Sequence, residues 1–167
     1  MSAVAAEKPY PTPRIRVPRF SEENGFYTTE ERSKLMAKIK GRNNKTEVAF
    51  RKWLWALGCR YRLNVKTLPG KPDLVFRKAR LAVFVDGDFW HGKNWAERKN
   101  DLKSNRDFWI PKIERNIQRD EEVNQLLRAQ DWHVLRFWES DLARDPLHAA
   151  QMVLDWLEYG VKGYGSE

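Results

Sequence analysis

Hydrophobic and polar residues alternate along the chain with two periods, one typical of amphipathic helices and one typical of β-strands. The helical period predicts four helices, at about residues 28–40, 46–57, 107–129 and 142–159. We expect four strands, at about residues 60–64, 73–77, 80–86 and 132–138, and the last three contain apolar runs rich in Val, Leu and Phe. The order α-α-β-β-β-loop-α-β-α is typical of an α/β fold in which helices flank both faces of a mixed β-sheet.

The segment between the third strand and the third helix, residues 87–106, shows neither period. It contains Gly, Asn and Ser, which predict a long loop, and loops of this length in a compact domain are usually functional. The helix that follows tolerates Pro111 because this residue falls in its first turn. Gly58 can end the second helix in a left-handed conformation.

Residues 1–27 differ in composition from the rest of the chain. They hold four of the eight prolines, together with Arg14, Arg16 and Arg19. This composition resists packing and predicts a flexible basic arm, which either contacts a polyanion or has no role. We therefore expect one folded domain at residues 28–160, preceded by the arm and followed by a C-terminal tail at residues 161–167.

The composition supports a folded domain and excludes several classes of protein. Hydrophobic residues make up 41% of the 167 residues, and eight residues are Trp, so the chain can bury a core. The single Cys59 excludes an internal disulfide. The sequence has neither an apolar run that could span a membrane nor the apolar stretch of a signal peptide, so we expect a cytoplasmic protein with no membrane partner.

Positive charge is concentrated in two segments of this chain, whose net charge is +8. Residues 32–66 contain eleven basic residues and one acidic residue, and residues 98–119 contain seven basic and three acidic residues. Such clustering predicts an electropositive face, and it favours a nucleic-acid partner over a merely solvated surface. A protein of this kind would be associated with the nucleoid.

Two short motifs beside predicted strands carry candidate catalytic residues. Residues 69–73 read Pro-Gly-Lys-Pro-Asp, and residues 84–91 read Phe-Val-Asp-Gly-Asp-Phe-Trp-His. Adjacent strands would bring Asp73, Asp86 and His91 to one edge of the sheet. Carboxylates gathered there suit a hard divalent cation and leave room for a substrate phosphate. Asp73 could instead cap a turn, but the number of residues between it and the second motif favours metal ligation.

His91 has a candidate partner on the long predicted helix. Asp120 lies three residues after Ile117 and seven before Leu127, so we expect it to point inward with this apolar stripe. A buried carboxylate needs a partner, and a His–Asp pair would make the imidazole a better base for deprotonating water. A salt bridge from Asp120 to a basic neighbour such as Arg119 is the alternative.

Other residues suggest contacts with DNA or with the metal site. Phe89 and Trp90 lie in a polar loop, where they either wedge between bases or fold back into the core. Lys112 and Asn116 share one edge of the long helix and either read bases or are solvated. Glu47 faces inward near a helix start, where it either supports the metal site or offsets the helix dipole.

The motifs and their spacing resemble the very-short-patch repair (Vsr-type) mismatch endonucleases of the PD-(D/E)xK nuclease superfamily, over about residues 32–160. The matching segments are Arg32-Ser33-Lys34-Leu35-Met36, Thr46-Glu47, residues 69–73, residues 83–91, residues 108–120 and residues 132–139. The resemblance implies a restriction-endonuclease-like fold. It also implies a Mg²⁺-dependent nick in one strand of double-stranded DNA beside a T·G mismatch, which arises when 5-methylcytosine deaminates.

The resemblance further implies a catalytic role for several residues. Asp73 would bind Mg²⁺ together with the backbone carbonyl of Val85. His91 with Asp120 would activate the attacking water, and Glu47 would support the site.

By the same resemblance, other side chains would contact DNA. Phe89, Trp90 and Trp109 would wedge into the duplex from the major groove. Met36 would enter from the minor groove, and the Lys112–Asn116 edge would meet the mismatched pair. A wobble pair stacks poorly, so intercalation beside it costs less.

The chain departs from the family at the positions of a structural zinc, which family members bind through Cys and His. Asp88, Lys93, Trp95 and Ser140 stand at the matching positions and form no thiolate site, so we expect no structural zinc. Other contacts, such as packing of Trp95, would then hold the loop. Asp86 stands where the best-known member has histidine, and it could bind the metal or act as the base.

We expect a monomeric nickase, with mismatch-repair proteins as candidate partners. The first alternative is a restriction-type or modification-dependent nuclease without a mismatch requirement. The second alternative is a non-catalytic DNA-binding module, against which the presence of Asp73, His91 and Asp120 argues.

Overall fold

A computed structural model describes residues 13–38 and 44–160 of the chain. The predicted C-terminal tail and the first part of the predicted arm lie outside these ranges. The described helices are η1 (Glu22–Asn24), α1 (Glu30–Lys38), α2 (Lys45–Ala56), α3 (Trp95–Arg98), η2 (Lys99–Asp101), α4 (Arg106–Arg128), α5 (Glu139–Arg144), α6 (Pro146–Asp155) and η3 (Trp156–Gly160). The strands are β1 (Arg62–Leu63), β2 (Leu74–Phe76), β3 (Leu81–Asp86) and β4 (His133–Trp138).

The strands form one mixed sheet in the order β1-β2-β3-β4. β1 pairs with β2 and β2 with β3 in antiparallel fashion, whereas β4 lies parallel to β3, with Leu81 opposite His133 and Asp86 opposite Trp138. The parallel register requires a crossover, and α4 supplies it. The predicted α/β fold with a mixed sheet flanked by helices is confirmed.

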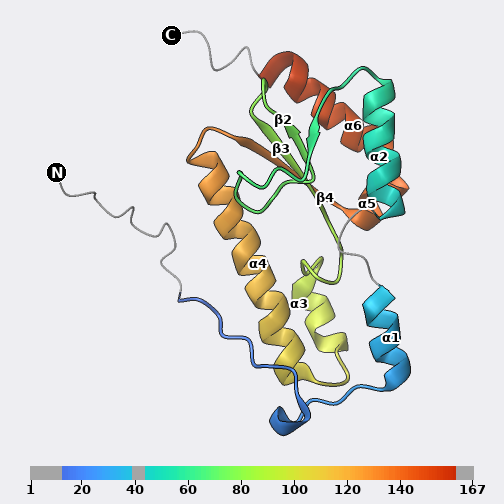
Figure 1. The fold of residues 1–167 in the computed structure, drawn as a ribbon, viewed down its shortest axis with the longest axis vertical. Coiled ribbons are helices and arrows are strands. Elements are labelled where there is room, and N and C mark those ends of the chain that lie inside the picture. The colour runs from blue at the N-terminus through green and yellow to red at the C-terminus, as the bar shows by residue number, and fades with distance from the viewer. Residues whose placement is uncertain (1–12, 39–43, 161–167) are drawn as a thin grey trace, which may run out of the picture.

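Helices cover both faces of the sheet (Figure 1). On one face, Leu81 and Val83 of β3 pack with residues of α2, α5 and α6, among them Phe50 and Val153. On the other face, alternate residues of β3 such as Phe84 pack against α4 and form a smaller core with it. The alternation follows from the period of two in a strand, and it decides which side chains of β3 and β4 can meet α4.

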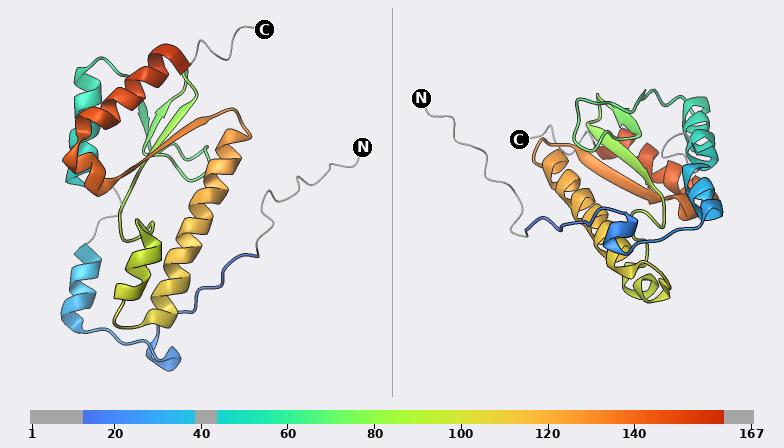
Figure 2. Two further views of the ribbon diagram at one scale, coloured as in Figure 1. Left: turned by 180° about the vertical axis from the view of Figure 1, so that it is seen from behind. Right: turned by 60° about the horizontal axis from the view of Figure 1, so that its bottom comes forward.

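The helix α4 extends well past the sheet (Figures 1 and 2). Its 23 residues span about 35 Å, whereas the six residues of β4 span about 20 Å. The N-terminal half of α4 lies beside α3, and α1 lies near them, away from the sheet. None of the helices within the described ranges combines the length and the apolar character needed to cross a membrane.

Two predicted elements differ from the observed ones. The predicted loop at residues 87–106 contains the short helices α3 and η2, and Asn94 and Asn105, which precede α3 and α4, adopt left-handed conformations. The predicted last helix is divided into α5, α6 and η3, because Asp145 caps a new helix that starts at Pro146. Hydrophobic periodicity registers neither difference, because α3 and η2 are too short for a period and the break before α6 depends on one capping residue.

The described part of the predicted flexible arm lies along α4. The Gln118 side chain accepts from the Ile15 N–H at 3.1 Å and donates to the Pro13 carbonyl at 3.1 Å. The rings of Phe20 and Phe26 pack against Phe108, with centroids 4.9 and 5.5 Å from it. Residues 13–27 therefore contact the domain, and flexibility of the arm stays a prediction.

Candidate active site

The C-terminal ends of β3 and β4 place several polar side chains at one edge of the sheet. Asp86 is the last residue of β3 and shares its face with Phe84, so it points toward α4. Arg136 of β4 lies opposite Phe84 in the register, and it also faces α4. Along α4, Asn116, Asp120 and Asn124 recur every four residues and face this edge.

Asp73 stands immediately before β2, where the antiparallel pairing brings it beside the end of β3. Its Oδ2 accepts a hydrogen bond from the Val85 N–H at 2.8 Å. The pKa of Asp73 is raised to about 6, mainly by burial and also by the charges of Glu47 and Asp86. The hydrogen bond from the Val85 N–H and the charge of Arg136 lower this pKa in part. No Lys or Arg within the described ranges forms an ion pair with Asp73. A partly buried carboxylate in this position favours a cation from outside the chain.

Glu47 is held at the start of α2. The Asn44 side chain caps the helix and accepts from the Glu47 N–H at 2.7 Å. Glu47 is 3% exposed, and its Oε1 forms an ion pair with Arg51 at 3.0 Å. The inward orientation predicted for Glu47 is confirmed. The charge of Glu47 raises the pKa of Asp73.

The predicted contact between His91 and Asp120 is present. His91 Nδ1 lies 2.5 Å from Asp120 Oδ2 and 3.5 Å from Asp86 Oδ1. With Nδ1 donating to Asp120, Nε2 is left as the proton acceptor of the neutral ring. Burial lowers the pKa of His91, but the hydrogen bond to Asp120 and the charges of Asp86 and Asp120 outweigh burial, and the pKa is raised overall.

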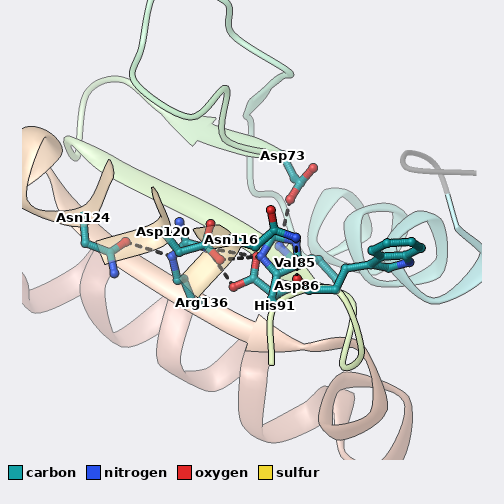
Figure 3. A network of polar contacts seen from close by, with 9 residues as sticks. Asp73, Val85, Asp86, His91, Asn116, Asp120, Asn124 and Arg136 are labelled. Carbon is teal, nitrogen blue, oxygen red and sulfur yellow. Dashed lines mark hydrogen bonds and ion pairs between the residues drawn. The ribbon is translucent and has the colours of Figure 1, made fainter. Parts of the chain in front are cut away.

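Arg136 is the centre of the network around this pair (Figure 3). Its Nη1 donates to both carboxylate oxygens of Asp86, at 2.9 and 2.8 Å, and lies 3.4 Å from Asp120 Oδ1. Its Nε donates to the Asn124 side chain at 2.8 Å, and its guanidinium lies over the Phe84 ring. Burial raises the pKa of Asp86, whereas the Arg136 charge lowers it. Arg136 thus balances two acidic side chains and fixes their positions.

Arg136 and Asn124 were not predicted as site residues from the sequence. An arginine inside an apolar strand, on the strand face turned toward a helix, was the available signal, because a charge in that position needs a buried partner. Asn124 continues the helical edge of Asn116 and Asp120 by one more turn.

The side chains at this edge offer oxygen donors for a metal, but few of them. Within the described residues, no group of three or more His, Cys, Asp or Glu side chains is arranged to hold an ion. Mg²⁺ needs fewer protein ligands, because it keeps waters and binds through one or two carboxylates plus substrate phosphate. Asp73 and the Val85 carbonyl fit such a site. Asp86 has both oxygens occupied by Arg136.

Aromatic side chains gather next to His91. The rings of Phe89, Trp90 and Trp109 lie 5.3 to 5.7 Å apart between centroids, and Phe89 is 36% exposed. Met36 of α1 lines the same cavity of about 460 Å³ as these three rings. An accessible aromatic cluster that lines a cavity can accept or displace a base.

The Lys112–Asn116 edge of α4 is divided between two roles. Asn116 Nδ2 donates to the Trp90 carbonyl at 2.8 Å, so it holds the aromatic loop against α4. Lys112 is partly exposed on the same helix. The structure therefore brings Glu47, Asp73, Asp86, His91 and Asp120 into one region, with the four residues of the aromatic cavity beside it.

Comparison with known proteins gives consistent matches. The family model described as DNA mismatch endonuclease Vsr matches residues 24–97. The type II nicking enzyme V.NmeDIP of Neisseria meningitidis serogroup C is 51% identical over 126 residues, which are 75% of this chain and 85% of that protein. V.HpaIIP of Haemophilus parainfluenzae, also named a type II nicking enzyme, is 49% identical over 71% of this chain and 85% of its own length. The DNA mismatch endonuclease Vsr of Escherichia coli (strain K12) is 30% identical over 81% of this chain and 86% of its own length.

Proposed function

Since this chain belongs to the Vsr family and is a DNA-cleaving hydrolase, we propose that it nicks one strand at T·G mismatches in a Mg²⁺-dependent reaction. The mismatch would be the product of 5-methylcytosine deamination. The observation that carries the proposal is the contact of His91 with Asp120, because His91 directly follows Trp90, which lines the cavity together with Phe89, Trp109 and Met36. The proton acceptor, His91 Nε2, and the aromatic surface on which unstacked bases could stack are thus carried by the same short turn.

Asp73 and the Val85 carbonyl would hold Mg²⁺ in this proposal. The bound ion would neutralise charge on the scissile phosphate. Two observations support Asp73 as the ligand: the carboxylate is largely buried, and it has no ion-pair partner within the described residues. The negative charge of Glu47 would make the electrostatic potential at Asp73 more negative, and this favours the binding of a cation there.

His91 would act as the general base. Its Nε2 takes the proton from water as the water oxygen bonds to phosphorus, and the bond from phosphorus to the leaving oxygen breaks. Asp120 keeps the Nδ1 proton in place and stabilises the imidazolium that forms. Asp86, whose oxygens are bound to Arg136, would position this pair and would not bind the metal.

The aromatic side chains would recognise the substrate by entering the duplex beside the mismatched pair. A T·G wobble pair stacks poorly, so opening the duplex there needs less free energy than at a matched pair. Lys112 would contact the pair or its phosphates, and Asn116 would keep Trp90 in position. The enzyme would act as a monomer, with mismatch-repair proteins as candidate partners.

A second candidate function is supported by the names of the relatives. Several are called type II nicking enzymes, a name that states no mismatch, and the second candidate is therefore a restriction-type or modification-dependent nickase without a mismatch requirement. The catalytic residues would be the same in both cases. Only the substrate requirement differs.

A strand-specific nicking assay tests the proposal. Wild-type protein and the Asp73→Ala variant are incubated with Mg²⁺ and an end-labelled duplex that carries either a T·G mismatch or the matched C·G pair. We expect a nick confined to the thymine strand of the mismatched duplex. Asp73→Ala should lower the rate by about 1,000-fold or more because the metal ligand is lost, while DNA binding is retained.

The other outcomes are equally informative. Equal cleavage of both duplexes by the wild type would move the protein to the second candidate function. Undiminished cleavage by Asp73→Ala would refute the metal role of Asp73. If neither duplex is cleaved, a pool of duplexes with randomised flanking bases separates an unmet sequence requirement from a non-catalytic DNA-binding module.

A further inference from the structure

A polar contact joins the turn after β3 to the start of α5. Lys93 Nζ donates to Ser140 Oγ and to Asp141 Oδ1, both at 2.7 Å. The Lys93 side chain is 18% exposed, so this ion pair is partly shielded from solvent. The contact spans 47 residues of sequence, and it is possible because the parallel strands β3 and β4 end at the same edge of the sheet.

The turn that Lys93 ends is closed by its own backbone. The Lys93 N–H donates to the Asp88 carbonyl at 2.9 Å, and the His91 N–H donates to the Gly87 carbonyl at 3.1 Å. The Asp88 side chain also accepts from the Ser140 N–H at 3.4 Å. Both ends of the turn are therefore tied to α5, and the segment between them carries His91 and the aromatic residues.

The residues present do not fit the structural zinc that the family resemblance implies at Asp88, Lys93, Trp95 and Ser140. The Lys93 ammonium group repels a cation, and it already donates to Ser140 and Asp141. Trp95 offers only an N–H donor, which is bound to Glu114 Oε1 at 3.3 Å. None of the four side chains is a thiolate or an imidazole, the ligands that zinc prefers.

We propose that Lys93 is a positioning residue whose bonds to Asp141 and Ser140 fasten the turn at residues 87–93 in place of a metal. The fastened turn keeps His91 at Asp120 and keeps Phe89 and Trp90 at the cavity. The function of Lys93 is independent of whether the substrate is a mismatch, because the turn carries the catalytic histidine in either case.

The proposed fastening has a physical signature that differs from that of a metal site. Added salt screens an ion pair that is only partly buried, whereas a chelator has no effect on it. Asp141 supports the assignment: its hydrogen bond to Lys93 lowers the pKa of its carboxyl, so the pair is charged at neutral pH.

The test uses the full-length protein, purified without added divalent metal, and four single variants. Lys93→Met removes the charge and keeps the chain length, Lys93→Arg keeps the charge, and Asp141→Asn removes the partner charge. Lys78→Met, an exposed lysine outside the ion pairs of the described residues, is the matched control. The readouts are zinc content, thermal unfolding without DNA, and the single-turnover nicking rate at 20 °C on a duplex that the wild type cleaves.

We expect Lys93→Met and Asp141→Asn each to lower the unfolding temperature by about 2–6 °C and the nicking rate by about 10-fold. Because Asp141 also pairs with Arg144 at 3.0 Å, a Lys93→Met/Asp141→Asn double variant is compared with Asp141→Asn. It should be little worse, because the ion pair with Lys93 is already lost there. Lys93→Arg should restore most of the rate, and Lys78→Met should behave as wild type. The zinc chelator 1,10-phenanthroline should leave unfolding unchanged, while added NaCl should reduce the difference between wild type and Lys93→Met.

Three results would overturn the proposal. One zinc per chain, or unfolding at a lower temperature in phenanthroline, would show that a metal fastens the loop. A wild-type rate in folded Lys93→Met would show that Lys93 does not position the site. A slow Lys93→Met beside a normal Asp141→Asn would show that Lys93 acts on DNA and not through Asp141.

Discussion

His91 is surrounded by charge from three elements: Asp86 on β3, Asp120 on α4 and Arg136 on β4. The two carboxylates raise its pKa, and Arg136 and burial lower it, with a net increase. A general base must be neutral to accept a proton, so its activity is present above its pKa and lost below it. The same two carboxylates that strengthen the base therefore also raise the pH at which it begins to work.

We predict that the single-turnover rate rises with pH through an inflection above about 6.5, the ordinary pKa of histidine. Asp120→Asn should lower the rate by about 10- to 100-fold and shift the inflection to lower pH, because a raising charge is lost. Glu121→Gln is the control, since Glu121 is an exposed neighbour on the same helix. An inflection that stays in place in Asp120→Asn would show that another group controls the rate.

The candidate site could be predicted from the sequence only in part. Asp73 and His91 lie beside strands, and Asp120 lies on a helical stripe, so local periodicity was sufficient to bring them together. Arg136 was missed, because its role depends on the register of β4 with β3, which no local pattern encodes. Asn116 was expected either to read bases or to be solvated, whereas its side chain donates to the Trp90 carbonyl.

At the scale of elements, the turn after β3 rests directly on α4. Gly92 has φ of +73°, and a Cβ at this position would lie 2.5 Å from Ile117 Cδ1 and 3.2 Å from Ile113 Cγ2. Glycine is required here on two counts: the left-handed backbone and the close approach of the helix. This close contact lets the turn that carries His91 pack near α4. The His91 ring therefore lies within hydrogen-bond distance of Asp120.

We predict that Gly92→Ala destabilises the protein by about 2–4 kcal/mol, because backbone strain and overpacking add. Gly58→Ala is the matched control: Gly58 also has a positive φ, of +88°, but a Cβ there would meet no atom within 4 Å. Urea unfolding of both variants separates packing from backbone strain. Equal destabilisation would mean that Ile117 yields to the added methyl group.

The order of the main elements followed from hydrophobic periodicity, because strands and long helices have strong periods. The finer divisions did not. A four-residue helix such as α3 has too few residues for a period, and the break between α5 and α6 depends on one capping aspartate. Nor does the pattern show that residues 13–27 lie against α4, since two of the hydrogen bonds there use backbone atoms of the arm.

At the scale of the whole molecule, the sheet and the N-terminal half of α4 form two regions (Figures 1 and 2). The sheet region holds the carboxylates, and the second region holds the aromatic cavity, which residues of α1, η2 and the first turn of α4 help to line. His91, the proposed general base, lies on the turn that joins them. Under the proposed function, recognition and cleavage would take place in different parts of the molecule, connected by a short segment.

We predict that Phe89→Ala and Trp90→Ala reduce the preference for a T·G duplex over the matched duplex by about 10-fold each, because a stacking surface is lost. Binding to the matched duplex should change little, since phosphate contacts dominate that affinity. Trp55→Ala, a change at an exposed tryptophan on α2, is the control. Equal weakening on both duplexes, measured by fluorescence anisotropy, would contradict a wedge.

The raised pKa of Asp73 has a thermodynamic consequence for the whole fold. A carboxyl whose pKa is about 6 in the folded protein and about 3.9 in the unfolded chain binds protons more tightly when folded. The metal-free protein therefore loses stability as the pH rises from about 4 to 6. At neutral pH the ionised Asp73 carboxylate destabilises the folded state. A divalent cation that neutralises this carboxylate would stabilise the folded state by linkage, so metal binding and folding reinforce each other. The ionised form of Asp73, the proposed metal ligand, would thus destabilise the folded protein least when the metal is bound.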